Sequence, residues 1–157
     1  MASVIIEERH NALRQKLGGV KIASLFTPER IAKCQELINT AHDEIRKDTY
    51  QRILAIKTGL KNFDTPEEEA FRASLLAEAH AIRNTAESLG MNMAFEVART
   101  LTLYVGMDKQ LVGKQRAITE QLVALLVLLF HEDAADDSSI ISREILSSLS
   151  QLEHRIG

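Results

Sequence analysis

One histidine lies on the outward side of a predicted helix, where its imidazole could do chemistry. In residues 64–90 the apolar side chains recur at steps of three and four, which predicts an α-helix with one buried face. That face comprises Phe71, Leu75, Ala79, Ile82, Ala86 and Leu89. His80 lies away from it, toward solvent. An exposed imidazole is largely neutral near pH 7 and can therefore act as a nucleophile.

The residues around His80 on the same side supply a cation, an amide, a carboxylate and a small apolar area. They lie one and two turns from His80 in both directions and comprise Ala73, Leu76, Arg83, Asn84 and Glu87. We interpret Ala73, Leu76 and Glu87 as candidate partner-binding residues. The chain has five histidines, so the alternative is that His80 is an ordinary solvated side chain.

The ends of this helix are also marked in the sequence. Thr65 can cap the helix, Pro66 fits its first turn, and Glu68 completes a capping box with Thr65. Gly90 follows Leu89 as a C-terminal glycine would. The helix that carries His80 is therefore expected to span residues 65–89.

The segment HAIRNTAESLG, residues 80–90, resembles the signature of histidine-phosphotransfer (HPt) domains. That signature reads His-x-Leu-Lys-Gly-Ser-(Ser/Ala)-x-x-(Leu/Ile)-Gly. His80 falls on the phosphorylated histidine, and the other matches are Ile82, Arg83, Thr85, Ala86, Leu89 and Gly90. The following segment MAFEVARTL also resembles the next helix of that family, and the similar helix layout covers roughly residues 30–131.

The resemblance implies a phosphorelay intermediate. His80 would accept a phosphoryl group from the aspartate of a response-regulator receiver domain and pass it to another receiver. Arg83 would assist, and Thr85 and Gly90 would support the local helix geometry. The protein would need no cofactor of its own, because Mg²⁺ and the aspartate belong to the receiver. Expected partners are receiver domains and a hybrid sensor histidine kinase, and we expect no autonomous kinase activity.

Asn84 departs from the signature, which has glycine at this position. The family's glycine leaves room for an incoming receiver, whereas an amide one turn after the histidine could orient water for dephosphorylation. A receiver-domain phosphatase is therefore the alternative function. A non-catalytic adaptor that binds through the same helix face is a further alternative.

Composition and periodicity predict an all-α protein. Hydrophobic residues make up 45%, aromatic residues 4%, and there are only two prolines and no Trp; this composition favours helices packed through aliphatic side chains. With the resemblance, it predicts an up-down antiparallel four-helix bundle over residues 27–131. Residues 1–26 form an N-terminal extension with a short helix at 3–17. Residues 132–157 form a loop and a C-terminal helix packed on the bundle.

Further helices are expected at 27–60, 92–106, 109–131 and 140–156. An apolar stripe on the first of these comprises Ile31, Cys34, Leu37 or Ile38, Ala41 and Ile45, so we expect Cys34 to be buried. The stripe on the last comprises Ile141, Ile145, Leu149, Leu152 and Ile156. It could pack on the bundle or pair with a second copy, so a homodimer through the C-terminal helix is a candidate assembly.

Several function classes are disfavoured. The net charge of −3 without a basic patch offers no case for nucleic acid. The apolar run at residues 122–130 is too short to span a membrane. A single cysteine allows no internal disulfide, which fits a cytoplasmic location. We find no nucleotide-binding motif and predict no metal site, because neither His42 with Asp43 nor the loop after His131 has the required ligand spacing.

Overall fold

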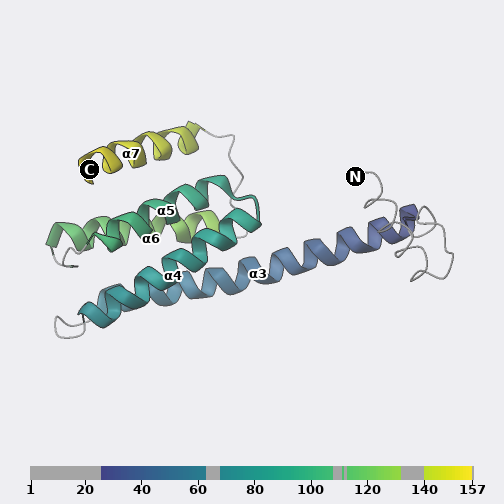
Figure 1. Ribbon diagram of the computed structural model, residues 1–157, viewed down its shortest axis with the longest axis horizontal. Helices are drawn as coiled ribbons and strands as arrows, with labels where there is room; N and C mark the ends of the chain where they lie inside the picture. The colour runs from purple at the N-terminus through teal and green to yellow at the C-terminus, as the bar shows by residue number, and fades with distance from the viewer. Residues whose placement is uncertain (1–25, 63–67, 108–110, 112, 132–139, 157) are drawn as a thin grey trace, which may run out of the picture. The chain divides into compact units, whose positions relative to one another are not determined.

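The computed structural model describes residues 26–62, 68–107, 111, 113–131 and 140–156, with only the backbone described at 140–142, 153, 155 and 156. These residues form helices and no strand (Figure 1). The helices are α3 (Pro28–Asn62), α4 (Glu68–Ser88), α5 (Asn92–Gly106), α6 (Gly113–Phe130) and α7 (Ile140–Ile156). The all-α prediction is confirmed. The expected helix at 3–17, the Thr65–Pro66 start and the loop at 132–139 lie outside the described residues.

Contacts divide the chain into two units, Met1–Ala41 and His42–Gly157. In the first unit, α3 begins where the sequence predicts. The Thr27 hydroxyl accepts a hydrogen bond from the backbone N–H of Arg30 (3.3 Å), and the Thr27 carbonyl accepts one from that of Ile31 (3.0 Å). Thr27 therefore satisfies donors that a helix start leaves unpaired.

The second unit contains a core organised around α5. This helix packs against α4, α6 and α7, and α4 turns back directly into α5 (Figure 1). The segment NMAFEVARTLTLYVG supplies small and aliphatic residues on nearly every side of α5, which is why it can be covered by several neighbours. Burial also raises the pKa of the Tyr104 hydroxyl above its ordinary value of 10.0. The core includes Ile53, Leu60, Leu75, Ile82, Val97, Leu101, Leu122, Leu126 and Phe130.

Three arginines bond to carbonyls at the carboxyl ends of helices that lie far away in the sequence. Arg46 of α3 donates to the carbonyls of Phe130 (3.3 Å) and His131 at the end of α6. Arg116 of α6 donates to the carbonyl of Leu60 near the end of α3. Arg72 of α4 donates to the carbonyl of Val105 near the end of α5 (3.5 Å). These cations pair with carbonyls that have no partner within their own helix, and they favour the negative end of its dipole.

The apolar stripe at the start of α3 is not buried, contrary to the sequence-based expectation. Cys34 is exposed, and so are Ile31 (53%), Leu37 (62%) and Ile38 (47%). The spacing correctly indicates a helix with an apolar face, but within the first unit no described residue covers that face. Periodicity reports which side chains share a face, whereas burial needs a partner surface.

The start of α6 also differs from expectation. Leu111 is buried as predicted, but it precedes the helix, which begins at Gly113. Its backbone N–H donates to the carboxylate of Glu68 at the start of α4. No helix among the described residues is both long and apolar enough to cross a membrane.

Candidate functional site

The outward face of α4 carries His80, and the structure agrees with the face assignment made from periodicity. Leu75, Ala79, Ile82 and Ala86 are buried on the opposite side. His80, Asn84 and Glu87 are exposed, as is Ala73, whereas Leu76 and Arg83 are half-buried. The six residues therefore share one side of a helix that the core holds in place.

The chemical groups of this face are available to a partner. Within the described part of the chain, no hydrogen bond or ion pair engages the side chains of His80, Arg83 or Asn84. The backbone carbonyl of Asn84 accepts a hydrogen bond from the Ser88 hydroxyl (2.9 Å), which leaves its amide uninvolved. An imidazole without an internal partner can present either ring nitrogen to an incoming group.

The turn after α4 explains the role of Gly90. Gly90 adopts φ of 68°, a conformation that residues with a Cβ rarely adopt. Its N–H donates to the Glu87 carbonyl (3.1 Å), and the Met91 N–H donates to the Ala86 carbonyl (2.8 Å). This pair of bonds is the Schellman motif that ends helices. Gly90 therefore ends α4 and sets the direction in which the chain continues into α5.

Thr85, the other predicted supporting residue, is half-buried beside the core-facing stripe. Its backbone carbonyl accepts a hydrogen bond from the N–H of Leu89 (2.9 Å), which continues the helical pattern through the last turn. The structure therefore places Thr85 on the flank of α4 rather than on the face of His80.

One edge of the His80 face continues onto α5. A Cβ added to Gly106 would lie 3.9 Å from Cδ1 of Leu76, so Leu76 lies over the end of α5. Leu103 of α5 (47%) and Met107, which directly follows α5 (38%), are exposed large apolar residues. The sequence analysis identified neither residue as exposed.

The other edge of α4 is held against α3 by charge. Arg52 donates to the Glu78 carboxylate through Nε (3.0 Å) and Nη2 (2.9 Å), so the pair is bidentate at the guanidinium side. Both side chains are partly exposed, at 41% and 33%, so the pair contributes modestly to stability. The pair joins α4 to α3 at Glu78, away from His80. Arg83 is therefore the cation on the side of α4 that carries His80.

Among the described residues no group of three or more His, Cys, Asp or Glu side chains could hold a metal ion. The His80 face presents an imidazole, a cation and an amide, which are groups that can contact an anionic partner group.

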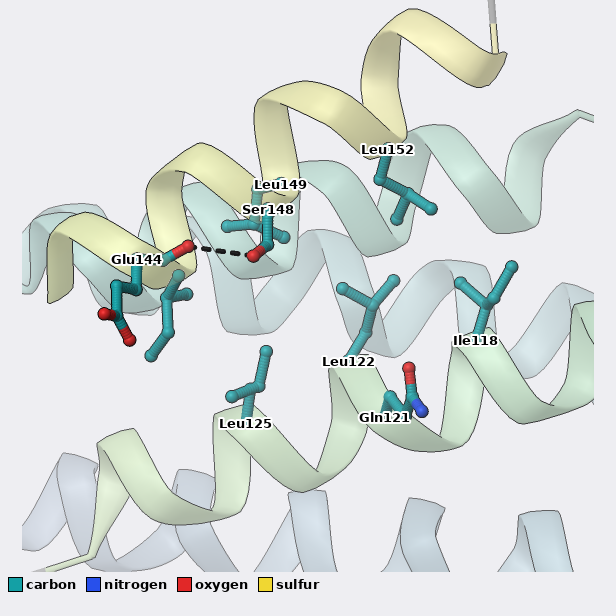
Figure 2. Close-up of a pocket in the computed structure, with 9 residues that line it drawn as sticks. Ile118, Gln121, Leu122, Leu125, Glu144, Ser148, Leu149 and Leu152 are labelled. Atoms are coloured by element: carbon teal, nitrogen blue, oxygen red, sulfur yellow. Dashed lines mark hydrogen bonds between the residues drawn. The ribbon is translucent and has the colours of Figure 1, made fainter. Parts of the chain in front are cut away.

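A separate groove of about 380 Å³ lies between α6 and α7 (Figure 2). Leucine and isoleucine side chains from the two helices face each other across it, with Gln121 on one side and Glu144 on the other. The Ser148 hydroxyl is directed along its own helix, because it donates to the Glu144 carbonyl (2.9 Å). The groove is lined by residues other than those of the His80 face.

Comparison of the chain with protein-family models, with curated proteins and with solved structures returned no match. The assignment of a function therefore depends on the chemistry of the His80 face and on the resemblance of residues 80–90 to the HPt signature.

Proposed function

We propose that the protein is a phosphorelay intermediate in which His80 carries the phosphoryl group between receiver domains. The observation that supports this most is the exposed, unengaged imidazole of His80 on a helix whose opposite face is buried. Such a helix holds the nucleophile still while leaving it open to a second protein. Positioning contributes much of the rate in phosphoryl transfer, since the protein performs little covalent chemistry of its own.

The reaction is a balanced exchange between two side chains. An unprotonated ring nitrogen of His80 attacks the phosphorus of the receiver's aspartyl phosphate in line. A phosphorus–nitrogen bond forms, and the bond between phosphorus and the aspartate oxygen breaks, which releases the aspartate as a carboxylate. The reverse exchange with a second receiver returns His80 to its starting form. Mg²⁺ bound to the receiver would neutralise most of the phosphoryl charge.

The residues around His80 take complementary roles in this proposal. Arg83 is half-buried one turn along, where its guanidinium can approach phosphoryl oxygens. Leu76 and Ala73 offer apolar contact to the receiver, and Glu87 lies on the rim. The proposal includes the up-down antiparallel four-helix arrangement for α3 to α6, a cytoplasmic location, and a hybrid sensor kinase as a further partner.

Transfer of label from a receiver tests the proposal. Receivers encoded near the same gene would be phosphorylated, mixed with the full-length protein, and followed over time. His80→Gln is the test variant, and His42→Gln is the matched control because His42 is also an exposed histidine on a helix. We expect acid-labile, base-stable label on the wild type and on His42→Gln, and none on His80→Gln. Equal labelling of all three proteins would overturn the role of His80.

Asn84 supports a second candidate, a receiver phosphatase. Its exposed amide lies one turn after His80 and has no internal partner among the described residues. There it could hold a water in line with the receiver's phosphorus. This function would release inorganic phosphate without labelled protein and would survive His80→Gln.

Substitution of Asn84 separates the two functions. Asn84→Gly should speed label capture if the amide merely crowds the receiver, and should abolish phosphate release if the amide positions water. Asn84→Ala is the companion variant, because alanine removes the amide while glycine also costs about 1 kcal/mol of helix propensity. A loss of activity in Asn84→Gly that Asn84→Ala does not share would point to helix destabilisation.

A further inference from the structure

The first half of α3 carries an apolar seam, which we define as Ile31, Cys34, Ile38 and Ala41. All four side chains are exposed. They follow one another at steps of three, four and three, and Ile45 continues the spacing at a further step of four. These are the a and d positions of a heptad repeat, which keeps one narrow stripe facing the same way along a supercoiled helix.

Some polar side chains of this part of the helix form hydrogen bonds within the helix itself. Gln35 donates through Nε2 to Oδ1 of Asn39 (3.0 Å), and the Thr40 hydroxyl donates to the Glu36 carbonyl (2.9 Å). Leu37 (62% exposed) flanks the seam and widens the apolar face, whereas polar and charged residues occupy most of the remaining positions.

The residue types at the a and d positions indicate which kind of surface would pack against the seam. Isoleucine occupies each a position, at 31, 38 and 45, and small residues occupy the d positions, Cys34 and Ala41. A straight stripe of heptad spacing fits a helix of the same spacing, since knobs and holes then remain in register. The α3 helix of a second copy has the same heptad spacing. If both copies use this same surface, they form a closed dimer with two-fold symmetry.

Other segments of the chain fit the seam less well. The apolar residues expected on the 3–17 helix are Val4, Ile5, Leu13 and Leu17, which do not follow an unbroken heptad. On α7, Leu149 is buried, and Ile145 and Leu152 pack against the chain's own core. We therefore propose that the protein forms a homodimer through a two-stranded coiled coil between the α3 seams of two copies.

Molar mass against concentration tests the dimer, using the full-length protein. Sedimentation equilibrium should show the wild type moving from 17.5 kDa toward twice that mass as concentration rises. Ile38→Asp should weaken association at least about tenfold, because each dimer would hold two charges in its seam. Ile38→Ala should weaken it less, and since alanine favours helix, that loss cannot arise from helix unfolding.

Ala32→Asp is the matched control. Ala32 is exposed on the same helix turn but lies off the seam. It should associate as the wild type does. A dimer that persists unchanged in Ile38→Asp would use another surface, and it would overturn the proposal. A wild type that stays at monomer mass at every concentration would overturn it as well.

The single cysteine provides an independent readout at the seam itself. Because Cys34 is the only thiol, its rate of modification by a maleimide reports on this position alone. The rate per molecule should fall at concentrations where the dimer forms, and should stay high in Ile38→Asp. Protection that is the same at all concentrations would mean that residues 1–25 cover the seam within one chain, which would contradict the proposal.

Discussion

The two halves of α3 have the same kind of apolar spacing and opposite burial. In the first half Ile31, Leu37 and Ile38 are exposed, whereas in the second Ile53, Ile56 and Leu60 are buried. The backbone is one uninterrupted helix through both. The comparison teaches that an apolar stripe specifies a surface that needs covering, and that the elements packed against it decide whether it is covered.

The polar contacts of the two halves differ in the same way. In the first half they join residues three or four apart on the helix itself, as in the bond from Gln35 to Asn39. In the second half Arg46 and Arg52 reach α6 and α4. Long-range polar contacts therefore accompany long-range apolar burial, because the same neighbouring helices provide both.

The largest expected difference concerns the isoleucines. Ile53→Ala should lower the free energy of unfolding by about 2–5 kcal/mol, because it removes a fully buried side chain and leaves a cavity. Ile38→Ala should change the stability of the monomer by less than about 0.5 kcal/mol. Urea denaturation at a concentration below dimer formation would measure both. Similar losses at the two positions would contradict the exposure of the first half.

A smaller difference in the free energy of unfolding is expected when a cation is removed from each half of α3. Arg46→Ala should cost about 1–2 kcal/mol, because the carbonyls of Phe130 and His131 would lose a charged donor at the end of α6. Lys33→Ala, an exposed cation of the first half, should lie within about 0.5 kcal/mol of the wild type. The same denaturation series applies. A negligible cost at Arg46 would show that water replaces this contact without loss.

The ion pair between α3 and α4 should contribute less to stability than the contacts of Arg46. A double-mutant cycle on Arg52 and Glu78 is expected to give a coupling of about 0.2–1 kcal/mol, since both side chains are partly exposed. The coupling should shrink in high salt. A matched cycle on Gln35 and Asn39 should give about 0.2–0.5 kcal/mol and little salt dependence. A salt-independent coupling at Arg52–Glu78 would mean that packing, not charge, joins the residues.

Alkaline pH should lower the stability of the second unit by a small amount through Tyr104. The folded state raises the pKa of Tyr104 above its ordinary 10.0, so the unfolded chain loses this proton first as pH rises. The stability of the second unit should therefore be unaffected by Tyr104 below pH 10 and should decline above it. Tyr104→Phe should make that decline shallower. Equal slopes for wild type and variant between pH 9 and 11 would exclude a contribution from Tyr104.

Much of the fold could be predicted from the sequence because its signals are local. The start of α3 at Thr27–Pro28 and the end of α4 at Gly90 depend on hydrogen bonds between residues close in the chain. The orientation of His80 away from the buried stripe follows from the helical repeat alone. The candidate site could therefore be located in outline, as a histidine with Arg83 and Asn84 on one exposed face.

The burial of Cys34 and the start of α6 were predicted wrongly for related reasons. Cys34 shares a face with isoleucines, but the described residues of its unit bring nothing against that face. Leu111 is buried beside Glu68 without being helical. For Cys34 the spacing of apolar residues was taken to imply burial, and for Leu111 burial was taken to imply a helical backbone; neither implication holds by itself.

What the sequence by itself determined is the presence of the five described helices, most of their ends, and the side of α4 on which His80 lies. The tertiary structure decided which apolar stripes are covered, which arginines bond to distant helix ends, and that Leu76 lies close to Gly106 at the end of α5. The physical reason is separation along the chain. Helix formation and capping involve residues within a turn or two, whereas burial and interhelical bonds depend on segments that only folding brings together.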